Sequence, residues 1–224
     1  MTKFLTDLIL KLFGKNAWIG IIILSMIPIT ELRGTIPFAL SGAWGAYSLT
    51  WWQAYICAVI GATIPACIII PLLIPVFNWM KKTKWFSKLA NSLDAKFSKH
   101  SNSIEGKVEE EGTQAKKERI KFLGVMSFVA VPLPLTGAWT GSAVAAYIKI
   151  NPLKGILAVF LGNMISGAIM TTLCLLLPNY VDQILNVFLI LALVVIVGSI
   201  VIHFVKKLKK KDAVALEEST TEEK

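Results

Sequence analysis

The sequence predicts an all-α integral membrane protein with two broken, re-entrant helical hairpins arranged as an inverted repeat, three full transmembrane helices and two interfacial amphipathic helices. Of the 224 residues, 55% are hydrophobic, and they occur in long blocks with a mean hydropathy of +0.65. Two blocks are interrupted by glycine, proline and polar residues, which leaves arms too short to cross a hydrocarbon core of about 30 Å. Irregular backbone at that depth persists only where it is buried in protein or lines a wet cavity, so each break predicts a site.

The first block follows an amphipathic stretch at the start of the chain. Residues 1–16 place apolar side chains on one face and polar ones on the other, as in a helix that lies in the membrane interface. Residues 17–47 then predict the first re-entrant hairpin, with arms at Ala17–Ile29 and Ile36–Tyr47. At about 1.5 Å per residue, the first arm covers only roughly 20 Å. The residues that favour a break are Pro28, Gly34 and Pro37.

The first half of the chain, 17–80, ends in a spanning helix at 54–77. Residues 81–121 then carry eleven Lys or Arg against six Asp or Glu, and the positive-inside rule assigns this segment to the cytoplasm. Apolar residues at helical spacing from Trp85 onwards predict the second interfacial helix within it.

The second half, 122–177, repeats this order. Residues 122–148 predict the second re-entrant hairpin, in which Pro132–Gly137 separates two arms that are each too short to span. A second spanning helix is expected at 153–177. The order of a broken hairpin followed by a spanning helix therefore occurs twice.

Orientation follows from the positive charges. A third spanning helix at 184–205 ends in the basic run Lys206–Lys211, which places the tail 206–224 in the cytoplasm of a multi-pass protein of the cell membrane. With 81–121 also inside, the two halves enter from opposite sides, as in inverted-repeat transporters. Lys3, Lys11 and Lys15 favour the opposite placement of the N-terminus, which would make 17–47 a single kinked span.

Charged residues at membrane depth are costly, so Glu31 and Arg33 are the first candidates for function. Arg33 suits a carboxylate or phosphate group, because its planar fork can bind two oxygens. The structural alternatives are a static ion pair, a turn that faces the headgroups, packing alone at the second break, and a simple interhelical hydrogen bond from Asn163. The complete candidate substrate and ion pathway comprises Thr30, Glu31, Arg33, Gly34, Pro37, Pro132, Pro134, Thr136, Gly137, Thr140 and Asn163.

The sequence gives little indication of a metal site, a cofactor site or a catalytic site. The three cysteines lie in apolar runs without CxxC spacing, and no metal site, cofactor or catalytic residue is expected. The net charge of +9 comes from residues beside apolar segments, where anionic lipid headgroups are the expected partner and nucleic acid is not. Expected partners are membrane lipids, a small amphipathic or lipid-phosphate substrate and a second copy of this chain. The candidate coupling ions are H⁺ and Na⁺.

Two segments carry a family resemblance. Glu31-Leu32-Arg33-Gly34-Thr35-Ile36-Pro37 and Val131-Pro132-Leu133-Pro134-Leu135-Thr136-Gly137-Ala138-Trp139-Thr140-Gly141 resemble the signatures of the putative small multi-drug export protein family, itself similar to the DedA superfamily. The likeness covers roughly residues 17 to 175. It implies two re-entrant hairpins that point toward one another, and a role in secondary transport or in translocation of a lipid such as undecaprenyl phosphate. The second hairpin has no acidic residue or arginine, so the full DedA charge set does not carry over.

The leading hypothesis is therefore an ion-coupled transporter of an amphipathic or anionic, lipid-like substrate, and not an enzyme. A membrane scaffold that binds anionic lipid through its basic segments is the first alternative. An intramembrane lipid-phosphate enzyme is the second, although the apolar regions contain no paired acids, HExxH or GxSxG motif.

Overall fold

The computed structural model describes residues 16–41, 49–82, 114–133 and 136–181, together with single positions at 11 and 13 and between 183 and 198. These residues form six α-helices and one short 3-10 turn, and none of them is in a β-strand. The predictions for most of 1–16, for 83–113, for most of 184–205 and for 206–224 fall outside the described residues. The described elements are α2 (Ala17–Met26), α3 (Glu31–Leu40), α4 (Trp51–Lys82), α6 (Gln114–Ala130), α7 (Ala138–Tyr147), α8 (Pro152–Leu176) and η3 (Pro178–Tyr180).

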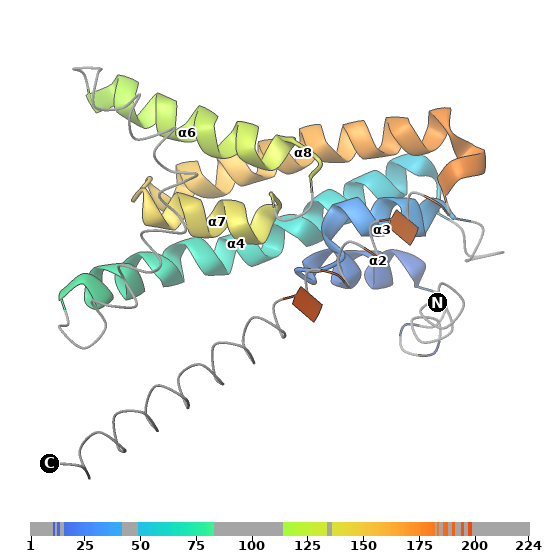
Figure 1. Cartoon of the computed structure of the whole chain (residues 1–224), viewed down its shortest axis with the longest axis horizontal. Helices are drawn as coiled ribbons and strands as arrows, with labels where there is room; N and C mark the ends of the chain where they lie inside the picture. Colours follow the sequence, from blue (N-terminus) through green and yellow to red (C-terminus); the bar gives the residue numbers. More distant parts are fainter. Residues whose placement is uncertain are drawn as a thin grey trace, which may run out of the picture.

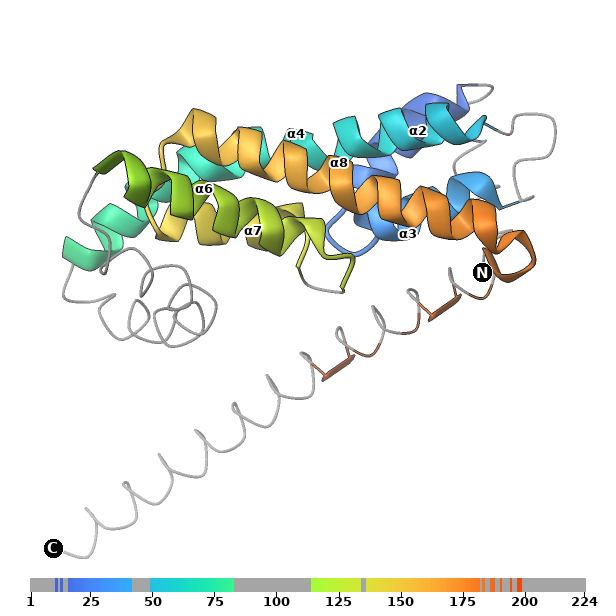
Figure 2. The same cartoon turned by 90° about the horizontal axis from the view of Figure 1, so that it is seen from above.

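Two long helices form the centre of the molecule. In Figures 1 and 2, α4 and α8 lie side by side and run in opposite directions, with α2 and α3 at one end and α6 and α7 at the other. Helix α2 packs on α3 and α4, and α6 packs on α7 and α8. Helix α3 also reaches α8, and α7 reaches α4. Exchanging α2 with α6, α3 with α7 and α4 with α8 leaves this set of contacts unchanged.

The long helices are apolar on the outside as well as inside. Residues Trp51–Phe77 of α4 and the whole of α8 are each long and apolar enough to cross a membrane. Helix α4 exposes a stripe of aliphatic side chains, and polar groups such as Asn163 and Ser166 of α8 are buried instead. A surface of this kind is suited to lipid, since large apolar patches are rare on soluble monomers. The exposed aliphatic residues of α4 are Ile56, Ile60, Ile68, Leu72 and Val76.

The first break lies earlier in the chain than the sequence predicts. Helix α2 ends at Met26 and α3 begins at Glu31, so only four residues separate them. The placement of the break between Ile29 and Ile36 is wrong, because α3 continues through both Gly34 and Pro37. Pro37 removes one backbone donor from α3, but the surrounding helices bury this stretch and keep it helical.

The other boundaries agree more closely with the sequence. The expected spanning helices at 54–77 and 153–177 correspond to α4 and α8, and the second break lies between Ala130 and Ala138, as predicted. Three prolines do not end α4, which is continuous to Lys82. Helix α6 begins at Gln114, inside the segment assigned to the cytoplasm, so the first arm of the second hairpin is longer than expected.

Two glycines allow α2 and α6, the first helix of each half, to approach a long helix closely. A Cβ atom at Gly61 of α4 would overlap the backbone carbonyl of Ile22 in α2. A Cβ atom at Gly162 of α8 would lie 2.8 Å from the carbonyl oxygen of Met126 in α6. Ile22 and Met126 both lie four residues before the last residue of their helix. The two contacts therefore occupy the same register in the two halves.

Candidate functional site

A buried ion pair occupies the place where the two breaks meet. The Nη1 atom of Arg33 lies 2.7 Å from Oε2 of Glu31, and the two residues are only 4% and 8% exposed. Glu31 opens α3 and Arg33 lies in its first turn, so the pair is formed within one short helix. Removing two charges from water is costly, and such a pair is stable only when further hydrogen bonds satisfy both groups.

Arg33 supplies those bonds to the end of α6. Its Nη2 atom donates to the backbone oxygens of Val129 and Val131, each at 3.0 Å, and lies 3.3 Å from Oγ1 of Thr136. The last carbonyl groups of a helix have no partner within the helix and carry the negative end of its dipole. A guanidinium group at this position therefore satisfies free acceptors and compensates their partial charge.

Glu31 lies at the opposite kind of helix end. Its Oε1 atom is 3.5 Å from the backbone nitrogen of Trp139, in the first turn of α7. A Cβ atom at Gly137 would overlap the Glu31 carboxylate. Gly137 has φ of −77°, which any residue can adopt, so glycine provides room here rather than backbone freedom. The carboxylate thus sits against the positive end of the α7 dipole.

The second hairpin makes a corresponding contact with the first. The indole Nε1 of Trp139 donates to the backbone oxygen of Met26, the last residue of α2, at 3.0 Å. Each half therefore donates a hydrogen bond from the first turn of its second short helix, α3 or α7. The acceptor is a free carbonyl group at the end of the first helix of the other half, α6 or α2. We call the set formed by Met26, Glu31, Arg33, Val129, Val131, Thr136, Gly137 and Trp139 the junction.

The backbone at Glu31 is strained. Its φ angle is +40°, and among the described residues only Lys149 shares a positive φ without being glycine. Non-glycine residues in this region cost of order 1 kcal/mol and persist where the surroundings fix them. The ion pair and the N-terminus of α7 fix Glu31 in this conformation.

Charged side chains are almost absent from α2, α4, α7 and α8, which pack around the junction. Helices α2 and α7 and residues 51–77 of α4 contain no Asp, Glu, Lys, Arg or His. Helix α8 contains only Lys154, which pairs with Glu118 of α6 at 2.6 Å on the surface. Within the described residues, no three His, Cys, Asp or Glu side chains gather as a metal site would require.

The other predicted residues of the first break and of the spanning helices lie outside the junction, within or between helices. Thr30 donates from Oγ1 to the Leu24 oxygen at 2.6 Å, which ties the break to α2. Gly34 and Pro37 are buried within α3, the helix that also carries the charged pair. Asn163 donates to Oγ1 of Thr63 in α4 at 3.0 Å, which is an interhelical hydrogen bond between the two long helices.

The predicted residues of the second break are divided. Thr136 belongs to the junction, where its hydroxyl also contacts the Val131 and Leu133 oxygens at 2.8 Å. Thr140 contacts the Gly137 oxygen at 3.2 Å, one turn into α7. Pro132 lies in the irregular stretch, and Pro134 is outside the described residues. Sequence reasoning missed Trp139, which joins the second hairpin to the first. Its place two residues after Gly137 marks the first turn of a helix.

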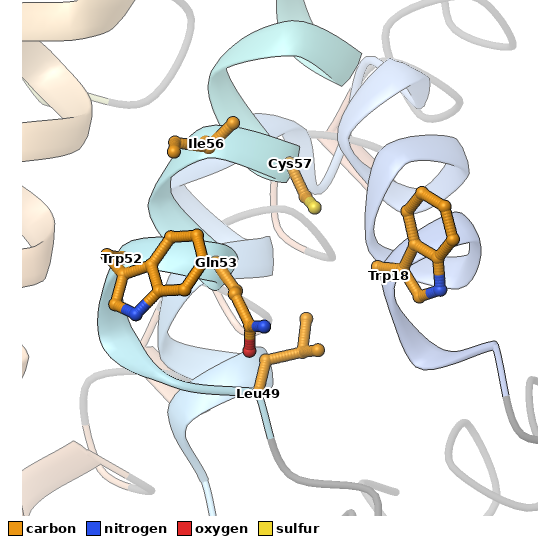
Figure 3. A pocket seen from close by; sticks show the side chains of 6 residues that line it. All are labelled: Trp18, Leu49, Trp52, Gln53, Ile56 and Cys57. Carbon is orange, nitrogen blue, oxygen red and sulfur yellow. The ribbon is translucent and has the colours of Figure 1, made fainter.

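A separate pocket of about 270 Å³ lies between α2 and the start of α4 (Figure 3). In Figure 3, Trp18 comes from α2, and Trp52, Gln53, Ile56 and Cys57 come from α4. The pocket contains no charged side chain and none of the junction residues. It therefore offers no chemistry comparable to that of the buried pair, which lies in a closed part of the molecule.

The helices and the junction define an all-helical membrane protein with a buried ion pair between broken helices. The family comparison gives a narrower assignment. Residues 31–169 match the model of the family described as "Putative small multi-drug export protein", and the chain belongs to this family. The match begins at Glu31, directly after the first break, and includes Arg33 and the second break. Neither the search of curated proteins nor that of solved structures found a match.

Proposed function

We propose that this protein is an ion-coupled membrane transporter that moves an amphipathic, anionic substrate past the junction. The single observation that carries the proposal is the buried Glu31–Arg33 pair at the meeting point of both breaks. A charged pair at this depth in an apolar protein is expensive, and intramembrane ionisable residues mark substrate or ion pathways by default. The family description, an export protein, supports transport rather than catalysis.

The arrangement of helices supports two re-entrant hairpins in an inverted repeat. Helices α2 and α3 have ten residues each, so each covers about 15 Å, half of a hydrocarbon core. The exchange of contacts between the two halves, the matching glycines Gly61 and Gly162, and the reciprocal donors at the breaks are what an inverted repeat would produce. In this arrangement the substrate site lies at the membrane midplane.

Membrane orientation follows from charge. The basic residues at the start of α6, together with 81–113 and the C-terminal tail, lie in the cytoplasm. A hairpin over 17–47 then places residue 2 and residues 48–50 on the same, outer side. Single cysteines at these positions, in a chain without its native cysteines, report the side by their reaction with a membrane-impermeant thiol reagent. Labelling of the two positions from opposite sides contradicts the hairpin.

The substrate and the coupling ion follow from the chemistry of the pair. Arg33 binds a carboxylate or phosphate head, and lipid phosphates such as undecaprenyl phosphate belong to this class. Glu31, the one carboxylate in the junction, carries the coupling proton. Na⁺ is the alternative coupling ion.

The test is a translocation assay in vesicles with a fluorescent alkyl phosphate, driven by a pH or Na⁺ gradient. Wild type moves the probe, whereas Glu31→Gln loses gradient coupling and Arg33→Ala loses uptake. Glu118→Gln, which removes an exposed carboxylate, is the matched control and retains transport. Unchanged transport in both junction variants removes the pair from the mechanism. Loss of function on deletion of the basic segments, without loss in the junction variants, favours a lipid-binding scaffold instead.

A further inference from the structure

The position of the Glu31 carboxylate resembles that of a bound ligand. It is held by the Arg33 guanidinium at 2.7 Å, faces the N-terminus of α7 at Trp139, and fills the room that glycine leaves at position 137. A helix N-terminus and an arginine are the groups that proteins use to bind phosphate and carboxylate ions. The chain thus places its own anion in a site with the properties of an anion-binding site.

We propose that this position is the binding site for the anionic head of the substrate, and that Glu31 occupies it as a built-in competitor. The substrate binds when the Glu31 side chain leaves, and Arg33 then exchanges one carboxylate for another anion without losing its charge partner. This inference rests on the proposed function for the existence of a substrate, but not for the geometry of the site.

Two further features fit such an exchange. The Nε atom of Arg33 is buried without a hydrogen-bond partner among the described residues, so the guanidinium has a donor that the internal carboxylate does not use. Glu31 is held with φ of +40°, a conformation that its release would relieve.

Binding to the purified full-length protein in neutral detergent tests the inference. The probes are dodecyl phosphate, inorganic phosphate and dodecyltrimethylammonium, followed by calorimetric titration. Removing the competitor raises the fraction of sites that are open, so Glu31→Ala binds dodecyl phosphate about tenfold or more tightly than wild type. Glu31→Gln, which keeps the size and removes the charge, shows a smaller increase. Glu118→Ala, an exposed carboxylate, has no effect.

Gly137→Ala identifies the location. In the Glu31→Ala background the new methyl group occupies the vacated position and returns the affinity to the wild-type value or below. Gly198→Ala in the same background is the control, because a Cβ atom at Gly198 meets nothing within 4 Å. Gly137→Ala lowers the melting temperature in the wild-type background and lowers it much less in the Glu31→Ala background, since the overlap is with that one side chain.

The outcomes distinguish a free anion from a lipid-like substrate, and they distinguish a failure of this inference from a failure of the proposed function. Tighter binding of both phosphates to Glu31→Ala supports a site for a free anion, and tighter binding of dodecyl phosphate alone supports a lipid-like substrate. Equal affinity of wild type and Glu31→Ala for both phosphates, or tighter binding of the cationic probe, overturns the inference. Because binding needs no gradient, a protein that binds in this way but transports nothing would refute the proposed function and leave this inference intact.

Discussion

The two ion pairs of this protein have almost the same length but differ in burial, which allows a direct comparison of their energies. Arg33 and Glu31 are 2.7 Å apart with side chains that are 4% and 11% exposed. Lys154 and Glu118 are 2.6 Å apart with side chains that are 54% and 28% exposed. Removing one partner of a buried pair leaves an uncompensated charge and costs about 3–5 kcal/mol. Exposed pairs contribute about 0–1 kcal/mol.

Arg33→Gln should therefore lower the melting temperature by about 10 °C, since about 1 kcal/mol corresponds to roughly 2–4 °C in a chain of this size. Changing Glu31 to Gln in the same chain removes the unpaired carboxylate, so the double variant is more stable than the sum of the single losses predicts. Lys154→Gln and Glu118→Gln shift the transition by no more than about 4 °C.

The assay is thermal unfolding in detergent, followed by a dye that becomes fluorescent on reaction with thiols as buried cysteines are exposed. Cys57 and Cys174 are buried in the fold and report its loss. Strict additivity of the single Arg33 and Glu31 variants would refute the reasoning, because it would mean that the two charges are not coupled. A loss at the surface pair as large as that at the junction would refute the argument from burial.

Two further changes test the packing around the junction by the same unfolding assay. Trp139→Phe keeps an aromatic ring but removes the donor to the Met26 oxygen, and should cost about 1 kcal/mol; no change would mean that this bond does not hold the break. Gly61→Ala forces α4 away from the Ile22 carbonyl and should cost about 1–3 kcal/mol, whereas Gly198→Ala, in open space, should change nothing. Equal stability of the two glycine variants would contradict the close approach of α2 and α4.

The parts of the fold that follow from length and hydropathy could be predicted from the sequence. The two long apolar segments, which became α4 and α8, need only a count of residues against a bilayer thickness. The second break was also placed correctly, because Pro132 begins an irregular stretch that no helix continues through. The sequence pattern misplaces the first break, because a proline ordinarily ends a helix, whereas Pro37 is buried among neighbouring helices and α3 continues through it.

Sequence reasoning selects the charged residues of the candidate site but not their contacts. Glu31 and Arg33 stand out because they are charged residues between two apolar stretches, where charge is costly, and that argument needs no structure. That Arg33 reaches the end of α6, 96 residues further along the chain, could not be derived from one sequence, because no local pattern specifies which carbonyl groups a distant helix leaves free. Trp139 was missed for the same reason, since its indole and its backbone nitrogen contact two different parts of the first hairpin.

The junction is symmetric in geometry but not in charge, and this difference determines how an anion can act on it. The second hairpin holds α2 through one neutral hydrogen bond from Trp139, whereas the first holds α6 through a charged group that is itself neutralised by Glu31. A ligand shifts an equilibrium only by binding its states unequally. An anion that takes Arg33 from Glu31 changes the charge balance at the ends of α6 and α7 and leaves the α2 contact as it was. In the proposed exchange, the α6–α7 hairpin is therefore the part of the protein whose position an anionic substrate would control.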